Sequence, residues 1–64
     1  MDGFIKLNKV ITSQISKPID VEVSQISRVE EYRGRARIWF GPDDDIRVCE
    51  TPDEVRRLIA AARG

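Results

Sequence analysis

The segment 51–64 at the end of the chain constrains the fold more than any other part of the sequence. Thr51 suits the N-cap of a helix, Pro52 suits the first helical position, and Glu54 completes the spacing of a capping box. Apolar side chains then recur on one helical face, at Val55, Leu58, Ile59 and Ala62. We therefore predict a helix over residues 52–63 whose apolar stripe packs on a sheet.

The length of 64 residues gives room for one domain. We predict a single domain over residues 1–64, with a β-rich body over residues 3–50 that precedes the helix. A domain of this size buries only about 60% of the surface that its unfolded chain exposes, so a monomer would be marginally stable. We therefore expect a homo-oligomer. The apolar content of 41% and the charged content of 34% are ordinary for a folded domain.

Charge and cysteine content argue against several classes of function. Eleven basic and eleven acidic residues cancel, so no global field draws the protein onto a membrane or nucleic acid, and any nucleic-acid binding would be local. One cysteine, Cys49, and no histidine provide neither an intramolecular disulfide nor a zinc ligand set, and no cofactor is expected. Residues 1–10 contain Asp2, Lys6 and Lys9, which is unlike a signal peptide or membrane span. We expect a cytoplasmic protein.

Alternating apolar residues indicate strands in the first third of the chain. Ile5 and Leu7 predict a strand over residues 3–10 with both side chains in the core. Residues 11–17 fit a loop or a frayed hairpin, which two isoleucines could anchor, Ile11 and Ile15.

The second strand is expected to begin at Pro18, because proline can begin a strand but cannot occupy its middle. Its inward positions are Ile19, Val21 and Val23, which alternate with the acidic residues Asp20 and Glu22. A short break at Ser24 and Gln25 follows.

The dipeptide Arg33-Gly34 predicts a tight turn between strands at 27–32 and 35–40, because glycine readily takes the positive φ that such turns need. An even-numbered loop opposes Val29 to Ile38 and places the apolar side chains of the second strand on one face. Those side chains are Ala36, Ile38 and Phe40.

Residues 41–45, Gly-Pro-Asp-Asp-Asp, predict a second turn. A register that opposes Phe40 to Ile46 also opposes Ile38 to Val48, which continues the same core face. The predicted fold class is therefore α+β: a small antiparallel sheet of four or five strands, open or barrel-like, with one C-terminal helix packed on one face. The helix end is suited, by charge and by conformational freedom, to Arg63 and Gly64.

The sheet face opposite the helix is the candidate functional surface. Strand alternation gives it six candidate binding residues: Arg28, Tyr32, Arg35, Arg37, Trp39 and Arg47. The predicted register places Trp39 between Arg28 and Arg47, with Glu30 opposite Arg37 and Tyr32 near Arg35. Guanidinium groups bind phosphate or carboxylate through paired hydrogen bonds, and aromatic rings can stack on bases.

Three interpretations of this face are open. Tryptophan, tyrosine and arginine are enriched at protein interfaces, which favours self-association or a protein partner. The same groups suit an anionic small ligand such as a signalling nucleotide. Arginine and tryptophan also contact each other across strands on faces that are only solvated. We favour the interface, because open sheet faces that hold tryptophan are seldom left bare.

No catalytic or metal site is predicted. The run Asp43–Asp45 lacks the alternating ligands of an EF-hand, so a solvated turn is expected there. Cys49, expected beside Arg37, has no neighbouring base that would make it a nucleophile. Six acidic residues lie within Asp43–Glu54, and this acidic segment of one subunit could meet the basic face of another.

Several separated segments share a pattern with known small proteins. They are Ile5-Lys6-Leu7, Pro18-Ile19-Asp20-Val21, Ile26, Val29, Ile38 and the stretch 46–55, Ile-Arg-Val-Cys-Glu-Thr-Pro-Asp-Glu-Val. This pattern resembles the flagellar FlbD family, and it is similar to short bacterial and phage reading frames with the same strand-rich body. The resemblance implies a small oligomeric α+β domain. Similar phage products bind host proteins or sequester signalling nucleotides, so our hypothesis is a non-enzymatic module that self-associates and engages a host protein, with an anionic-ligand binder as the alternative.

Overall fold

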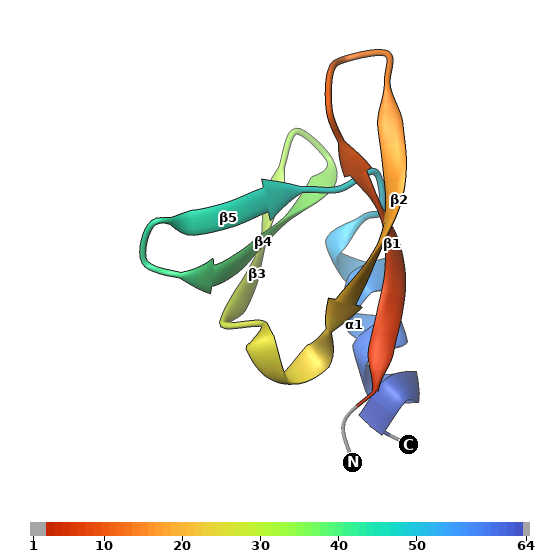
Figure 1. The fold of residues 1–64 in the computed structure, drawn as a ribbon, viewed down its shortest axis with the longest axis vertical. Helices are drawn as coiled ribbons and strands as arrows, with labels where there is room; N and C mark the ends of the chain where they lie inside the picture. Colours follow the sequence, from red (N-terminus) through yellow and green to blue (C-terminus); the bar gives the residue numbers. More distant parts are fainter. Residues whose placement is uncertain (1–2, 64) are drawn as a thin grey trace.

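The computed structural model describes residues 3–63, which form five strands and one α-helix (Figure 1). The elements in chain order are β1 (Phe4–Val10), β2 (Ser16–Glu22), the 3-10 helix η1 (Val23–Gln25), β3 (Arg28–Tyr32), β4 (Arg35–Gly41), β5 (Asp44–Arg47) and α1 (Pro52–Arg63). The predicted α+β class with one C-terminal helix is confirmed. The strands, however, divide into two antiparallel sheets, β1-β2 and β3-β4-β5, and do not form one continuous or barrel-like sheet. The expectation for Gly64 lies outside the described residues.

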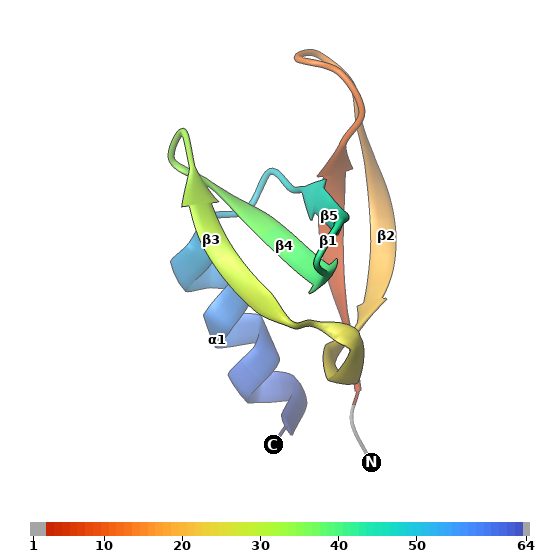
Figure 2. The same cartoon turned by 90° about the vertical axis from the view of Figure 1, so that its left-hand side faces the viewer.

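The β1-β2 hairpin supplies the first part of the core. Its register pairs Ile5 with Val21 and Leu7 with Ile19, and the side chains of Ile5 and Leu7 are buried as predicted. The two predicted anchors of residues 11–17 are wrong: Ile11 is 50% exposed and Ile15 is 58% exposed. Both belong to the hairpin turn, which extends beyond the rest of the molecule (Figures 1 and 2).

Pro18 is the third residue of β2, so the prediction that the strand begins there is wrong. It pairs with Asn8, whose backbone groups point away from β2: the N–H donates to the Glu50 carboxylate and the carbonyl accepts from the Cys49 N–H. This pair therefore exchanges no backbone hydrogen bonds. Because β2 has no second neighbour strand among residues 3–63, the missing N–H of proline removes no ladder bond, and proline is tolerated.

The β3-β4 hairpin forms as predicted around a two-residue turn. Arg33 has φ +53° and Gly34 has φ +82°, and positive values at both turn positions suit the right-handed twist of the flanking strands. The Gly34 N–H also donates to Glu31 Oε2 at 2.6 Å. Val29 pairs with Ile38, which confirms the predicted register.

The predicted β4-β5 register is wrong by two residues. Ile38 pairs with Ile46, and Trp39 pairs with Asp45, because the turn is shorter than the five residues expected. Gly41 and Asp44 already pair, and a bulge between Trp39 and Gly41 absorbs the mismatch. A shift of two residues preserves the alternation of faces, so the core side chains still point inward.

The segment that follows β5 joins the two sheets. Val48 N–H donates to the carbonyl of Ala36 in β4 at 3.1 Å, whereas the next residue, Cys49, donates to the carbonyl of Asn8 in β1 at 2.8 Å. Val48 also forms an isolated antiparallel bridge with Lys9. The chain thus leaves one sheet and contacts the other within two residues, which holds the sheets side by side.

Helix α1 closes the core against β1, β3 and β4 (Figure 2). Thr51 Oγ1 accepts the Glu54 N–H at 3.2 Å, which confirms the N-cap. Val55 is completely buried, and Ile59 and Ala62 are partly buried against the core. Leu58 is 37% exposed, so it lies at the margin of the stripe and not at its centre. Eight residues form the buried core: Ile5, Leu7, Val21, Val23, Ala36, Ile38, Val48 and Val55.

Candidate functional site

The open face of the three-stranded sheet holds a continuous row of arginine and aromatic side chains. We call it the Arg/Trp face and define it by residues that lie on this face or contact one another across it: Arg28, Glu30, Tyr32, Arg37, Trp39, Asp45 and Arg47. Five of the six predicted binding residues are among them. The sixth, Arg35, is the first residue of β4, and its Nη1 donates to the Cys49 carbonyl at 3.0 Å.

Trp39 lies on β4, the central strand of the face. Its indole N–H donates to Glu30 Oε1 at 2.7 Å. The guanidinium carbon of Arg28 lies 4.7 Å from the ring centroid, and that of Arg37 lies 4.6 Å from it. The sequence-based expectation that Trp39 lies between Arg28 and Arg47 is wrong, because the corrected register places Asp45 in the β5 position. Two cations nevertheless contact the ring, which suits its negative face.

Arg37 links the two aromatic residues. It pairs with Glu30 across β3-β4 as predicted, and its Nε lies 2.5 Å from Asp45 Oδ2. Its guanidinium carbon is also 5.9 Å from the centroid of the Tyr32 ring. The hydrogen bond that Arg37 donates to Asp45 raises the pKa of Arg37; desolvation opposes it, and the charges of Asp45 and Glu30 add to the increase. Arg37 is therefore a fixed cation at any physiological pH.

Tyr32, the last residue of β3, is the second aromatic residue of the row. Besides Arg37, the guanidinium carbons of Arg33 and Arg47 lie 5.5 Å and 5.6 Å from its ring centroid. Arg28, Trp39, Arg37, Tyr32 and Arg47 thus follow one another in contact across three strands. The arrangement fixes side chains that would otherwise be flexible.

Asp45 is a residue of this face that the sequence reasoning missed. The run Asp43–Asp45 was expected to lie in a solvated turn, but Asp45 belongs to β5 and its carboxylate holds Arg37. A Pro-Asp turn of two residues would by itself oppose Asp45 to Phe40, and the bulge between Trp39 and Gly41 moves it opposite Trp39. The missing signals were therefore the length of the turn and the bulge, which the sequence alone leaves ambiguous.

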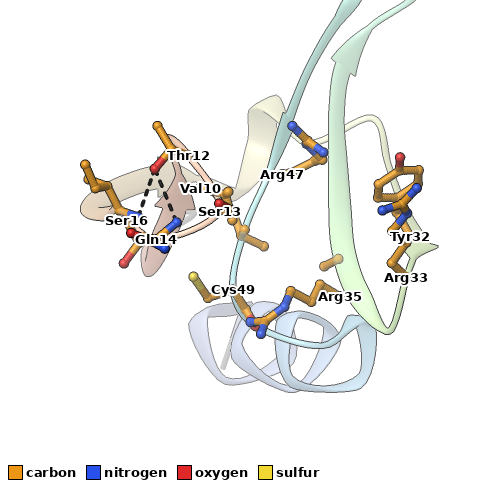
Figure 3. Close-up of a pocket in the computed structure, with 13 residues that line it drawn as sticks. Val10, Thr12, Ser13, Gln14, Ser16, Tyr32, Arg33, Arg35, Arg47 and Cys49 are labelled. Atoms are coloured by element: carbon orange, nitrogen blue, oxygen red, sulfur yellow. Dashed lines mark hydrogen bonds between the residues drawn. The ribbon is translucent and has the colours of Figure 1, made fainter.

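A cleft of about 420 Å³ lies between the tip of the β1-β2 hairpin and the end of the three-stranded sheet (Figure 3). Cys49 lies in its wall, near Arg35 and not beside Arg37 as expected. The cleft is lined by Val10, Thr12, Ser13, Gln14, Ile15, Ser16, Tyr32, Arg33, Arg35, Ala36, Arg47, Val48 and Cys49. Sequence reasoning missed this site because residues 12–16 had no predicted position relative to the sheet.

Within residues 3–63, no group of three acidic or cysteine side chains gathers as metal ligands would. The one α-helix described is too short and too polar to cross a membrane. Comparisons of the chain with protein-family models, with curated proteins and with solved structures find no match. The resemblance to the FlbD family stays a prediction.

Proposed function

We propose that this protein is a non-enzymatic binding module that self-associates and engages a protein partner through its Arg/Trp face. The observation that carries the proposal is the position of Trp39. Its ring contacts the guanidinium groups of Arg28 and Arg37, and its indole N–H donates a hydrogen bond to Glu30. Each of these contacts orders a large side chain on an open sheet face before any partner arrives.

Pre-organisation of this kind favours association. Binding normally costs about 0.5 to 1.5 kcal/mol for each flexible side chain that becomes immobilised. Here the contacts among Trp39, Tyr32 and the arginines already restrict those side chains in the free protein. Tryptophan, tyrosine and arginine are also the residue types that contribute most to interface energy.

The charge distribution supports a partner surface that is acidic. Five arginines reach the face or its border, whereas its two acids are Glu30 and Asp45, which pair with Arg28 and Arg37. The chain carries matching acids elsewhere, since Asp43, Asp44, Asp53 and Glu54 are exposed. A second copy therefore offers a complementary surface, and so does a partner protein with similar acidic residues. Short phage products that bind host proteins support a host protein as that partner.

Sedimentation velocity tests the proposal directly. The wild-type chain should assemble as its concentration rises from low to high micromolar, and salt should weaken the assembly because exposed charges are screened. Trp39→Ala should weaken self-association by about tenfold or more, as expected for a residue at the centre of an interface.

Arg57→Gln is the matched control, because it removes one positive charge from an exposed position on α1. It should leave assembly unchanged, whereas Arg28→Gln should weaken it. A partner protein should be captured by the wild-type and Arg57→Gln chains and not by Trp39→Ala. A wild-type chain that stays monomeric at high micromolar concentration and captures no protein in a Trp39-dependent manner would contradict the proposal.

A further inference from the structure

The cleft at the hairpin tip has an unusual charge balance. Three arginines line it, Arg33, Arg35 and Arg47, and the lining contains no aspartate or glutamate. The ion pairs recorded among residues 3–63 all involve other arginines: Arg28 with Glu30, Arg37 with Asp45, and Arg56 with Asp53. Within residues 3–63, Arg28 and Arg37 of the Arg/Trp face thus each have an acidic partner, whereas the three arginines of the cleft, including Arg47 at its border with that face, form no ion pair.

Two of these arginines are positioned on the same wall. Arg35 is fixed by its hydrogen bond from Nη1 to the Cys49 carbonyl, which leaves its other N–H groups able to donate. Arg47, the last residue of β5, also lines the cleft, and its guanidinium carbon lies 5.6 Å from the centroid of the Tyr32 ring (Figure 3). Both side chains belong to exposed residues, so they keep a positive field at the mouth without a large desolvation cost.

The opposite wall is a polar loop with a defined shape. Thr12 Oγ1 accepts the backbone N–H groups of Gln14 at 3.2 Å and Ile15 at 3.1 Å, which fixes the turn (Figure 3). The hydroxyls of Ser13 and Ser16 and the amide of Gln14 also line the cleft. These groups can donate hydrogen bonds to an anion that the arginines hold.

Apolar groups complete the lining. Val10, Ile15, Ala36 and Val48 contribute to it, and the Tyr32 ring lies at its border with the Arg/Trp face. The volume of about 420 Å³ falls within the range of roughly 300 to 1,000 Å³ typical of small-molecule sites. The cleft is thus large enough for an organic group as well as an anion.

We propose that this cleft binds a small phosphorylated organic molecule, whose phosphate contacts Arg35 and Arg47 and whose organic part contacts Val10 and Ile15. A phosphate monoester carries a charge of about −1.5 to −2 at neutral pH, which matches several uncompensated guanidinium groups better than a single carboxylate does. This site goes beyond the proposed protein-binding function, and it adjoins the Arg/Trp face, with which it shares Tyr32 and Arg47.

Isothermal titration calorimetry with three probes tests the inference. Adenosine 5′-monophosphate and ribose 5-phosphate both carry the phosphate, and adenosine carries the base and sugar without it. Both phosphorylated probes should bind saturably, and adenosine should not. Tighter binding of the nucleotide would assign the natural ligand to nucleotides, and equal binding would assign it to sugar phosphates. Saturating phosphorylated probe should also slow alkylation of Cys49, the single thiol, because Cys49 lines the cleft.

Variants on both walls separate this site from the Arg/Trp face. Arg47→Gln should weaken binding of the phosphorylated probes by about tenfold or more, as expected when a hydrogen bond to a charged group is lost. Ser13→Asp should do the same by repulsion from the opposite wall, and because Ser13 is an exposed loop residue the chain should still fold and self-associate. Arg28→Gln removes the same charge outside the cleft and should have little effect.

Two results would overturn the inference: neither phosphorylated probe binds, or adenosine binds as tightly as its monophosphate. Equal weakening by Arg28→Gln and Arg47→Gln would also overturn it, because the response would then reflect net charge and not the cleft. Two results would support the cleft independently of the proposed function. In the first, Ser13→Asp loses probe binding and keeps self-association. In the second, the wild-type chain is monomeric and still binds the phosphorylated probes.

Discussion

Asp45 pairs with Trp39 across the β4-β5 ladder, yet its carboxylate engages Arg37, with 2.5 Å between Oδ2 and Nε. The contact is diagonal, and long side chains readily make such contacts across neighbouring strands. Its effect is to hold the Arg37 guanidinium over the indole ring, 4.6 Å from the centroid. An acidic residue thus orders a cation–aromatic contact in which it takes no direct part.

Asp45→Asn should loosen that contact without unfolding the protein. The substitution keeps the shape of the side chain and removes its charge, and solvent screening limits the contribution of this partly exposed ion pair to global stability. We expect a weaker near-ultraviolet circular dichroism signal from Trp39 and only a small change in the melting temperature. An unchanged tryptophan signal would show that the ring is held without Asp45, and Asp44→Asn at the neighbouring exposed position is the control.

The near-ultraviolet circular dichroism signal of Trp39 in the wild-type chain should not change as the pH rises through the neutral and mildly alkaline range, because Arg37 stays charged there. Because the folded-state pKa of Arg37 is raised, the stabilisation from its charge is complete below the unfolded-state pKa and is lost only above it. A transition of the Trp39 signal near neutral pH would contradict this assignment.

Sequence patterns were sufficient where a single physical rule decides the structure. The helix over residues 52–63 followed from its cap and stripe, and the Val29–Ile38 register followed from a turn that only positive φ values can close. The predicted face survived an error of two residues at β4-β5, because strand alternation has a period of two.

Other features depend on contacts between residues far apart in the chain. The division into two sheets results from the crossing at Val48 and Cys49, where backbone donors find acceptors in β4 and then in β1. The position of Pro18 depends on the absence of a third strand beside β2, and the cleft depends on how far the β1-β2 hairpin extends. Local propensity contains no information on any of these.

Gly34→Ala isolates the cost of a backbone conformation. A Cβ at Gly34 would meet no atom within 4 Å, so the entire effect comes from φ +82°. We expect a loss of about 1 to 2 kcal/mol in the free energy of unfolding, measured by urea denaturation. Gly41→Ala is the matched control, because its Cβ also meets nothing within 4 Å, and it should be close to neutral. Equal losses for the two variants would contradict the turn assignment.

Ile38→Ala tests the small core. Ile38 is completely buried, and the substitution removes three carbon atoms from the contact region between β4 and α1. We expect a loss of about 2 to 5 kcal/mol in the free energy of unfolding, which is a large part of the total for a domain of this size. Ile11→Ala makes the same chemical change at a 50% exposed position and should change stability by less than about 0.5 kcal/mol. Similar losses for both would place Ile11 in a core contact.

Glu50 joins the two sheets through both its backbone and its side chain. Its carbonyl accepts the N–H of Ala36 in β4 at 2.8 Å. Its carboxylate accepts two hydrogen bonds from Asn8 in β1, from the backbone N–H at 3.1 Å and from Nδ2 at 3.0 Å. These contacts connect residues 42 positions apart in the sequence, so they stabilise only the assembled fold.

Glu50→Ala should therefore weaken the junction between the sheets. Hydrogen bonds to a charged group contribute about 1.5 to 3 kcal/mol each, and exposure of Asn8 to water lowers that value, so we expect a total loss of about 1 to 3 kcal/mol. Amide hydrogen exchange of Asn8 should accelerate more than that of Ile38 in the middle of β4, because the opening is local to the junction. Glu50→Gln keeps one acceptor oxygen and should have an intermediate effect, whereas uniform acceleration of all amides would show that the junction opens only when the whole domain unfolds.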